Sequence, residues 1–338
     1  MVRTGVTPRT RSDLACGACS CKAICCAIVV ALYSVPQAMV AAGYLRKCIP
    51  SPVGGENAGL IDMAILAEEF YSVNASVTLT MLGTVLGLLP ILLGGTPEQC
   101  QRLLVPFLRT SGAPLAGFCS SEPGGSANSG SLPPGEGVRT TARREGDNWV
   151  ITGRKKWVSS ATSWNREGAD VLCVVCRTDS AAPPSEAISI IAVEGPVKGL
   201  VFERAIDTIG HRAHLVPQFE LQNVAAPHRN LLGQEGAGLA LTAAGFTGTA
   251  ALVGIFGVAL MRAAFEFALH FAQTEKRGGV TRLSSIRRSD MRWPMPRPRS
   301  TPPAISAGAP VTRSIPSRRG PMNLPSRPRS LARKPQCA

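Results

Sequence analysis

The residues best suited to chemistry lie in one short segment, residues 117–128, which reads GFCSSEPGGSAN. Two hydroxyl side chains, Ser120 and Ser121, precede an acidic residue, Glu122, and a pair of glycines. Glycine lets backbone N–H groups approach a ligand closely, so such a loop can bind a pyrophosphate. Pro-Gly-Gly is also a common turn sequence, and by itself the segment is compatible with either interpretation.

Two further segments with suitable chemistry follow along the chain. Residues 140–142 read TTA, and residues 153–159 read GRKKWVS. Trp157 offers a flat apolar surface beside the hydroxyl of Ser159, which would suit a planar heterocycle, although a single tryptophan also packs well in a core.

Taken in order, these segments resemble the acyl-CoA dehydrogenase family of flavoproteins. The family pattern xTEPGxGSD, TTA and WITN stands here as SEPGGSAN at 121–128, TTA at 140–142 and KWVS at 156–159. Residues 227–233, PHRNLLG, are similar to the family's VPxENLLG, so the resemblance covers about residues 37–279. The EPGGSAN variant looks closer to the fungal nitroalkane oxidase branch than to the fatty-acid enzymes.

The resemblance implies an FAD cofactor between a middle β domain and C-terminal helices. Residues 118–121 would line the isoalloxazine, residues 126–128 would face the pyrophosphate, and the Ser159 hydroxyl would reach flavin N5. A donor at N5 stabilises charge that develops there during reduction. Arg277 would reach the phosphates of a neighbouring subunit's cofactor. The full predicted set is Phe118, Cys119, Ser120, Ser121, Ser126, Ala127, Asn128, Trp157, Val158, Ser159 and Arg277.

The family's reaction needs a carboxylate that removes a proton alpha to a thioester or nitro group. Some branches carry it on the first long C-terminal helix, at a position that aligns near Thr249. Threonine cannot act as a base at neutral pH, and the sequence after residue 281 holds a single acid, Asp290. We therefore predict no catalytic residue in this chain. The function expected is an FAD-dependent oxidoreductase, inactive as it stands, with a nitroalkane oxidase-type flavoprotein as the alternative.

The spacing of hydrophobic residues indicates which parts of the chain are helical and which are β structure, and these parts must position the candidate residues. Residues 34–113 have helical spacing, with a helix start at Thr96 and Pro97. Residues 230–280 return to helix and include a long apolar run at 250–273.

Residues 114–229 read as β structure. The sequence GDN at 146–148 predicts a hairpin, and further strands are expected at 149–152, 171–177, 188–193 and 218–221. The predicted fold is α+β and acyl-CoA dehydrogenase-like, with an N-terminal helical domain, a β-barrel-like middle domain and a truncated C-terminal helical domain.

The two ends of the chain depart from this pattern. The 338 residues carry a formal charge of +14, of which +12 lies in residues 281–338, a segment rich in Pro, Arg and Ser. We predict a disordered basic tail there, with a shifted reading frame as a hypothesis for its origin. Binding of an anionic partner through this tail is the non-enzymatic alternative. Nucleic acid is not expected, because the tail has one aromatic residue for base stacking. Residues 1–33 form an atypical leader with five of the 11 cysteines.

Metal sites and membrane spans are not expected. Cys173 and Cys176 form a CxxC inside an apolar run, which is more typical of a buried strand than of a metal or redox pair. The apolar stretches at 77–93 and 236–261 have amphipathic, charged flanks and predict buried helices rather than spans. The expected partner is a small molecule, either acyl-CoA or a nitroalkane-like compound. The family forms tetramers, but the truncated helices leave the assembly of this chain open. The expected location is intracellular.

Overall fold

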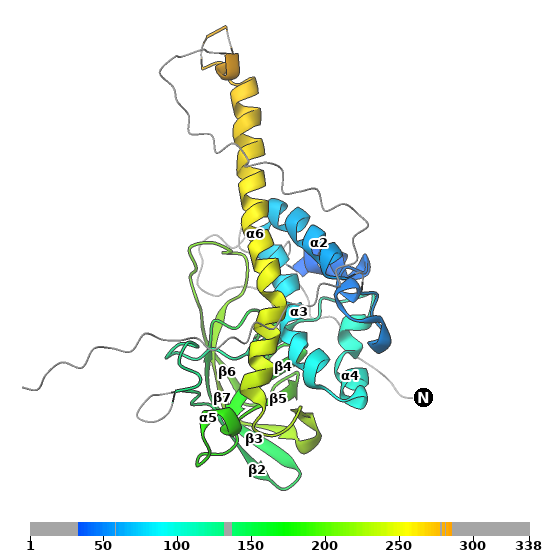
Figure 1. Ribbon diagram of the computed structural model, residues 1–338, viewed down its shortest axis with the longest axis vertical. Helices are drawn as coiled ribbons and strands as arrows, with labels where there is room; N and C mark the ends of the chain where they lie inside the picture. The colour runs from blue at the N-terminus through cyan, green and yellow to red at the C-terminus, as the bar shows by residue number, and fades with distance from the viewer. Residues whose placement is uncertain (1–32, 58, 132–136, 278, 281, 286–338) are drawn as a thin grey trace, which may run out of the picture. The chain divides into compact units, whose positions relative to one another are not determined.

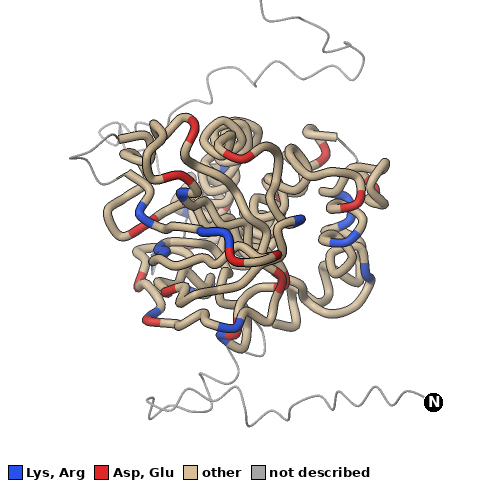
Figure 2. The backbone as a smooth tube through the Cα atoms, turned by 90° about the horizontal axis from the view of Figure 1, so that it is seen from below, with Lys and Arg blue, Asp and Glu red and all other residues tan. Residues whose placement is uncertain are grey.

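The computed structural model describes residues 33–57, 59–131, 137–277, 279–280 and 282–285 (Figure 1). The expectations for the cysteine-rich leader and for nearly all of the basic tail lie outside these residues. The described chain up to Leu283 belongs to one compact unit. Acidic and basic residues are interspersed along its backbone (Figure 2), in line with the small net charge predicted for it.

The N-terminal part is helical, as the hydrophobic period predicts. A helical segment at 33–41 is followed by η2 (Arg46–Cys48), η3 (Ser51–Val53), α2 (Leu60–Val73), α3 (Ala75–Gly94), α4 (Pro97–Leu103) and η4 (Val105–Leu108). The predicted start of α4 is confirmed, since the Thr96 side chain accepts the N–H of Gln99 and the Gln99 side chain accepts the N–H of Thr96.

Helix α3 lies at the centre of this part of the molecule. The side chain of Asn74 caps it by accepting the N–H groups of Ser76 and Val77, each at 3.1 Å. Its buried side chains, among them Leu88 and Ile91, join a core cluster that includes residues of β1 and β4. The helix therefore connects the helical part to the sheet.

The middle of the chain forms one mixed eight-stranded sheet. Its strands are β1 (Ala116–Cys119), β2 (Thr141–Glu145), β3 (Asn148–Lys156), β4 (Val171–Arg177), β5 (Ile188–Glu194), β6 (Leu200–Ala205), β7 (Pro217–Pro227) and β8 (Leu231–Leu232). They lie in the order β6-β7-β3-β2-β4-β5-β8, with β1 pairing parallel to β4. The short elements α5 (Pro184–Ala187) and η5 (His228–Asn230) flank β5 and β8.

Two local predictions for the sheet are confirmed. Strands β2 and β3 form the expected hairpin, with Glu145 opposite Asn148 and Gly146 at a φ of 54° in the turn. Cys173 and Cys176 are fully buried on β4, where burial raises the pKa of both thiols. They are free cysteines of a core strand.

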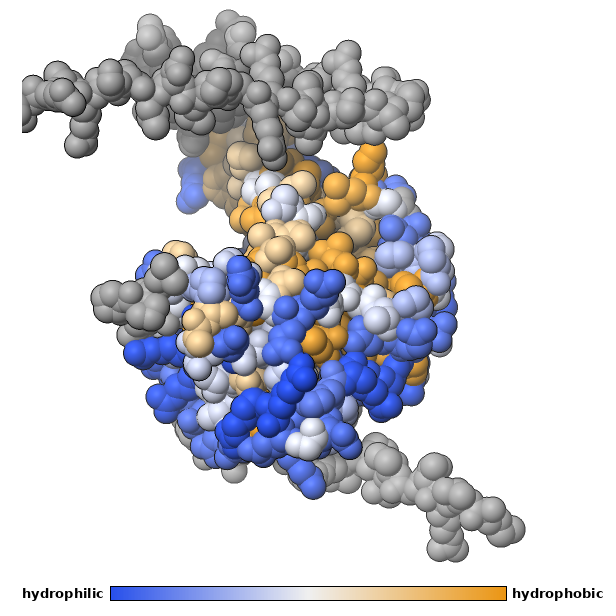
Figure 3. Space-filling view, turned by 60° about the horizontal axis from the view of Figure 1, so that its bottom comes forward, coloured by the Kyte–Doolittle hydropathy of each residue, from blue (hydrophilic) through white to orange (hydrophobic). Residues whose placement is uncertain are grey.

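Helix α6 (Gly238–Thr274) is where the structure departs from expectation. We expected its first two-thirds to be buried, yet most of its side chains are exposed, including Val253, Met261 and Phe267. Apolar residues consequently reach the surface (Figure 3). The expectation of a buried helix was wrong here because, among the described elements, α6 packs mainly against α2 and α3, with smaller contacts to β5 and α5.

By length and composition alone, α3 and α6 could each cross a membrane. In α3, 61% of the apolar window is buried inside the protein, as predicted for a core helix, whereas in α6 the figure is 11%. Uniformly apolar helices of this kind occur both in cores and in membranes, so composition does not distinguish the two.

The close packing of α3 against the sheet generates a test at Gly83. A Cβ at this position would lie 2.9 Å from the Cβ of Ser159, so Gly83→Ala should destabilise the protein by about 1–3 kcal/mol. Gly257→Ala on α6 is the matched control, because no atom lies within 4 Å of its Cβ position and alanine favours helix by up to about 1 kcal/mol. Urea unfolding of both variants provides the measurement. A Gly83→Ala protein as stable as the control would contradict this packing.

Candidate functional site

Strand β1 presents alternate side chains to two different cores. Phe118 faces the helices and stacks on Phe246 of α6, with ring centroids 5.2 Å apart and an interplanar angle of 25°. Cys119 points the other way into the core of the sheet, where burial raises the pKa of its thiol to about 12. The end of β1, where the flavin ring is expected, therefore meets the first turns of α6.

A buried ion pair fixes the loop that follows β1. The Glu122 carboxylate accepts hydrogen bonds from Lys155 Nζ at 2.8 Å, from the N–H and hydroxyl of Thr140 at 3.0 and 2.6 Å, and from the N–H of Arg139 at 2.8 Å. The Lys155 side chain has no exposure and also donates to the carbonyl of Val175 at 2.7 Å. Burial alone would raise the pKa of Glu122, but the Lys155 ammonium and these donors hold it below its usual value.

The glycine turn beyond Glu122 faces outward. The N–H of Gly125 donates to the Glu122 carbonyl at 2.9 Å, and Gly125 has a φ of 96°, which favours glycine. No atom lies within 4 Å of the position a Cβ would take at Gly125, so the space beside the turn is open. The next residues, Ser126, Ala127 and Asn128, are exposed and form a further turn.

The segment after β3 lies against this loop. The N–H of Lys156 donates to the Ser121 carbonyl at 3.0 Å, which joins the end of β3 to the end of the first loop. Trp157 has a φ of 61° and a ring that is 44% exposed, so it is not a core residue. Val158 is buried, and Ser159 is half-buried against Gly83 of α3. The structure thus brings the predicted residues 118–121 and 157–159 into one region.

Arg277 is not brought to this region. It lies three residues beyond the end of α6, where its guanidinium sits 5.2 Å from the centre of the Phe271 ring. A helix of 37 residues is roughly 55 Å long, and Phe246 lies near the opposite end of α6. A contact between Arg277 and the cofactor of a neighbouring subunit remains a prediction.

Thr249, near the position expected for the family's base, is hydrogen bonded to its own helix. Its hydroxyl lies 3.3 Å from the carbonyl of Gly245 and 3.2 Å from that of Phe246, in the preceding turn of α6. A hydroxyl engaged with its own helix backbone neither accepts nor stores a proton from a substrate.

Sequence reasoning missed two histidines beside the site. His211 and His214 lie between β6 and β7 and reach the helices, where His211 Nε2 hydrogen bonds to the Tyr71 hydroxyl and His214 Nδ1 lies 3.0 Å from the Thr80 hydroxyl. Burial, followed by the neighbouring His211, lowers the pKa of His214 to about 4. No local pattern marks these residues, because their partners lie more than 130 positions away in sequence.

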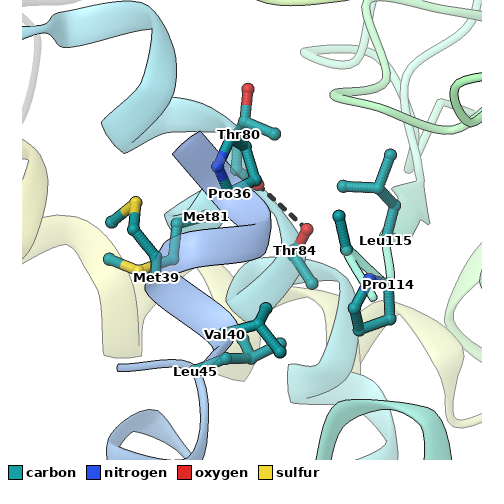
Figure 4. Close-up of a pocket in the computed structure, with 10 residues that line it drawn as sticks. Pro36, Met39, Val40, Leu45, Thr80, Met81, Thr84, Pro114 and Leu115 are labelled. Carbon is teal, nitrogen blue, oxygen red and sulfur yellow. Dashed lines mark hydrogen bonds between the residues drawn. The ribbon is translucent and has the colours of Figure 1, made fainter. Parts of the chain in front are cut away.

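Two cavities lie elsewhere. One is small and mostly apolar, beside Thr80, Met81 and Thr84 of α3, where the Thr84 hydroxyl donates to the Thr80 carbonyl (Figure 4). A second of about 250 Å³ lies at residues 109–114 and Trp164. Neither is lined by a predicted cofactor residue. Within the described ranges, no group of three or more potential ligands could hold a metal ion.

The Glu122–Lys155 pair can be tested by substitution. Lys155→Met leaves a buried carboxylate without its cation, so the free energy of unfolding should fall by about 3–5 kcal/mol. Adding Glu122→Gln should restore part of that loss, because the uncompensated charge disappears. The control is Lys156→Met, next in sequence but only half-buried. In a denaturant titration, the free energy of unfolding should be highest for the control, lower for the double variant and lowest for Lys155→Met. Any other order contradicts a coupled buried pair.

Comparison with known proteins supports the geometry. The chain matches the acyl-CoA dehydrogenase N-terminal domain over residues 32–111 and the acyl-CoA dehydrogenase middle domain over residues 117–224. It is 42% identical over 262 residues to nitroalkane oxidase of Podospora anserina, covering 73% of this chain and 59% of that protein. Nitroalkane oxidase of Fusarium oxysporum is 35% identical over 254 residues, covering 70% and 57%.

A solved structure agrees with the sequence relatives. A nitroalkane oxidase in complex with spermine, a competitive inhibitor, superposes with a TM-score of 0.71 at 32% identity, covering 76% of this chain and 63% of that one. The chain thus spans about three-fifths of the length of the relatives it matches. Because both domain matches, the sequence identities and the superposition agree, the chain belongs to the acyl-CoA dehydrogenase family of FAD flavoproteins, with nitroalkane oxidases among its relatives.

Proposed function

We propose that this chain binds FAD as the cofactor-holding part of an oxidoreductase. The observation that carries the proposal is the convergence of two predicted segments, residues 118–121 and 157–159, through the hydrogen bond from the Lys156 N–H to the Ser121 carbonyl. The ion pair between Glu122, directly after the first segment, and Lys155, just before the second, links the two segments.

The residues present fit a flavin. The exposed ring of Trp157 can pack on a planar heterocycle, and the Ser159 hydroxyl makes no hydrogen bond to any described residue. Open space beside Gly125 leaves room for backbone N–H groups to meet a pyrophosphate. Bound there, FAD would supply an acceptor for the electron pair of a substrate C–H bond.

The proposed substrate is a small molecule with a proton made acidic by a neighbouring nitro or thioester group. The relatives are nitroalkane oxidases and, at 30% identity, a short-chain specific acyl-CoA dehydrogenase of Mus musculus. Proton removal from such a molecule needs a base. Thr249 is engaged with its own helix, so we propose that the chain binds flavin without turning over a neutral substrate.

The proposed state of assembly follows from the same family membership. Relatives in this family oligomerise, and the exposed apolar side of α6 leaves room for further helices or subunits. Tetramer formation by this chain is a proposal. Binding of an anionic partner through the basic tail has no structural observation in its favour, because the tail lies outside the described residues.

Flavin binding is tested directly with purified protein. We expect stoichiometric FAD with flavin absorbance, and a several-fold weaker dissociation constant in Trp157→Ala. Ser163→Ala is the control, because Ser163 lies in the same segment but outside the predicted set. A protein that takes up no FAD under any refolding or reconstitution condition would refute the proposal.

The missing base is tested in the same preparation. Under anaerobic conditions a neutral nitroalkane should leave the flavin oxidised, whereas the preformed nitronate anion, which has already lost its proton, should reduce it. Rapid bleaching by the neutral nitroalkane would show that another residue serves as the base. Bleaching by neither compound would contradict a nitroalkane-type substrate for this site.

A further inference from the structure

His214 is a buried titratable residue beside the segment of the predicted flavin contacts, and the candidate site described above does not use it. Its side chain is 6% exposed and lies between α3 and the segment after β3. The position that a Cβ would occupy at Gly83 is 3.4 Å from Ser159 Oγ and 3.9 Å from His214 Cε1. The imidazole and the Ser159 hydroxyl therefore border the same glycine.

Hydrogen-bond accounting fixes the tautomer of His214. The Thr80 hydroxyl lies 3.0 Å from the Ser76 carbonyl and 3.0 Å from His214 Nδ1. A hydroxyl has one proton and the carbonyl can only accept, so Thr80 donates to Ser76 and accepts the N–H of Nδ1. A neutral imidazole with its proton on Nδ1 presents Nε2 as an acceptor.

The protonation state agrees with this assignment. Burial and the nearby His211 hold the pKa of His214 at about 4, so the ring is neutral at pH 7. His211 is in turn hydrogen bonded to the Tyr71 hydroxyl of α2.

His214 Nε2 is buried and has no hydrogen-bond partner within the described chain. An unpaired buried acceptor costs roughly 1–3 kcal/mol, so a donor is expected there. The Ser159 hydroxyl, which borders the same glycine, also makes no hydrogen bond to any described residue, so the two groups are near each other but not yet joined by a hydrogen bond. These two groups have complementary needs.

The hydrogen bond between flavin N5 and a neighbouring hydroxyl reverses its direction when the flavin is reduced. Oxidised N5 accepts a hydrogen bond, and reduced N5 carries a proton and donates one. A serine that accepts from N5–H must place its own hydroxyl proton on a second acceptor. Without such an acceptor, the contact to the reduced ring is weakened.

We propose that His214 is a positioning residue for Ser159, whose hydroxyl proton it accepts at Nε2 when Ser159 Oγ accepts a hydrogen bond from the reduced flavin. This inference rests on the proposed FAD site. No proton is transferred; only hydrogen bonds are rearranged. The Thr80 hydroxyl fixes the tautomer that makes Nε2 available, and the arrangement stabilises the reduced cofactor relative to the oxidised one.

The test is the midpoint potential of the FAD-loaded protein, measured by equilibration with a reference dye. His214→Phe should shift the equilibrium roughly tenfold toward oxidised flavin, about 30 mV for a two-electron couple. His214→Gln, which places an acceptor near the position of Nε2, should recover most of the shift. His228→Gln is the matched control, because His228 Nε2 is also buried and unpartnered among the described residues but lies in η5.

Coupling to Ser159 provides the second measurement. Ser159→Ala should lower the potential, and adding His214→Phe should lower it no further, because both substitutions remove the same interaction. Additive shifts, or an unchanged potential in His214→Phe with FAD bound, would overturn the inference while leaving the proposed flavin site intact. If His214→Phe does not fold, Thr80→Val, which releases the tautomer, takes its place with the same expectation.

Nitrogen NMR of the four histidines separates this inference from the proposed function. With or without FAD, His214 should be neutral near pH 6 with its proton on Nδ1. A proton on Nε2 would overturn the inference even in a protein that binds no flavin. Failure to bind FAD would overturn the proposed function and, with it, the role assigned to Ser159.

Discussion

The buried pairing of Glu122 with Lys155 is the interaction on which the candidate site depends. A carboxylate and an ammonium removed from water need every hydrogen-bonding position satisfied. Here the partners come from four segments: the loop after β1, the start of β2, the end of β3 and the middle of β4. The pair therefore fixes the acidic residue of the loop while its glycines face outward, where a ligand can reach them.

Helix α6 completes the arrangement along one side. Near its start Phe246 stacks on Phe118 of β1, and further along Phe256 stacks on Tyr71 of α2 at 4.3 Å. Arg262 then binds Glu68 and Glu69 of α2. These contacts bury one stripe of the helix and leave most of its other apolar side chains exposed.

The residues expected to bind the cofactor and the residue expected to remove a substrate proton lie in different parts of the chain. The residues predicted to contact the cofactor lie mostly in the sheet and its loops, whereas the hydroxyl of Thr249, near the position expected for the family's base, is bonded to its own helix. The chain also spans about three-fifths of the length of its relatives. Cofactor binding and substrate turnover are therefore separate proposals for this chain, each with its own test.

The sequence by itself determined the family, the order of helices and strands, the β2–β3 hairpin, the start of α4 at Thr96 and Pro97, and the burial of Cys173 and Cys176. Each depends on residues close together in the chain, where turn chemistry, capping and hydrophobic period act locally. Only the tertiary structure decided that Lys155 is fully buried between an exposed Arg154 and a half-buried Lys156. Strand alternation favours an inward side chain at Lys155 but does not supply its partners. The meeting of His214 with Thr80 and the exposure of α6 were likewise tertiary outcomes. The physical reason is that both depend on contacts with residues far away in the sequence. The residues next to a histidine or within an apolar helix do not indicate which distant residues will contact it.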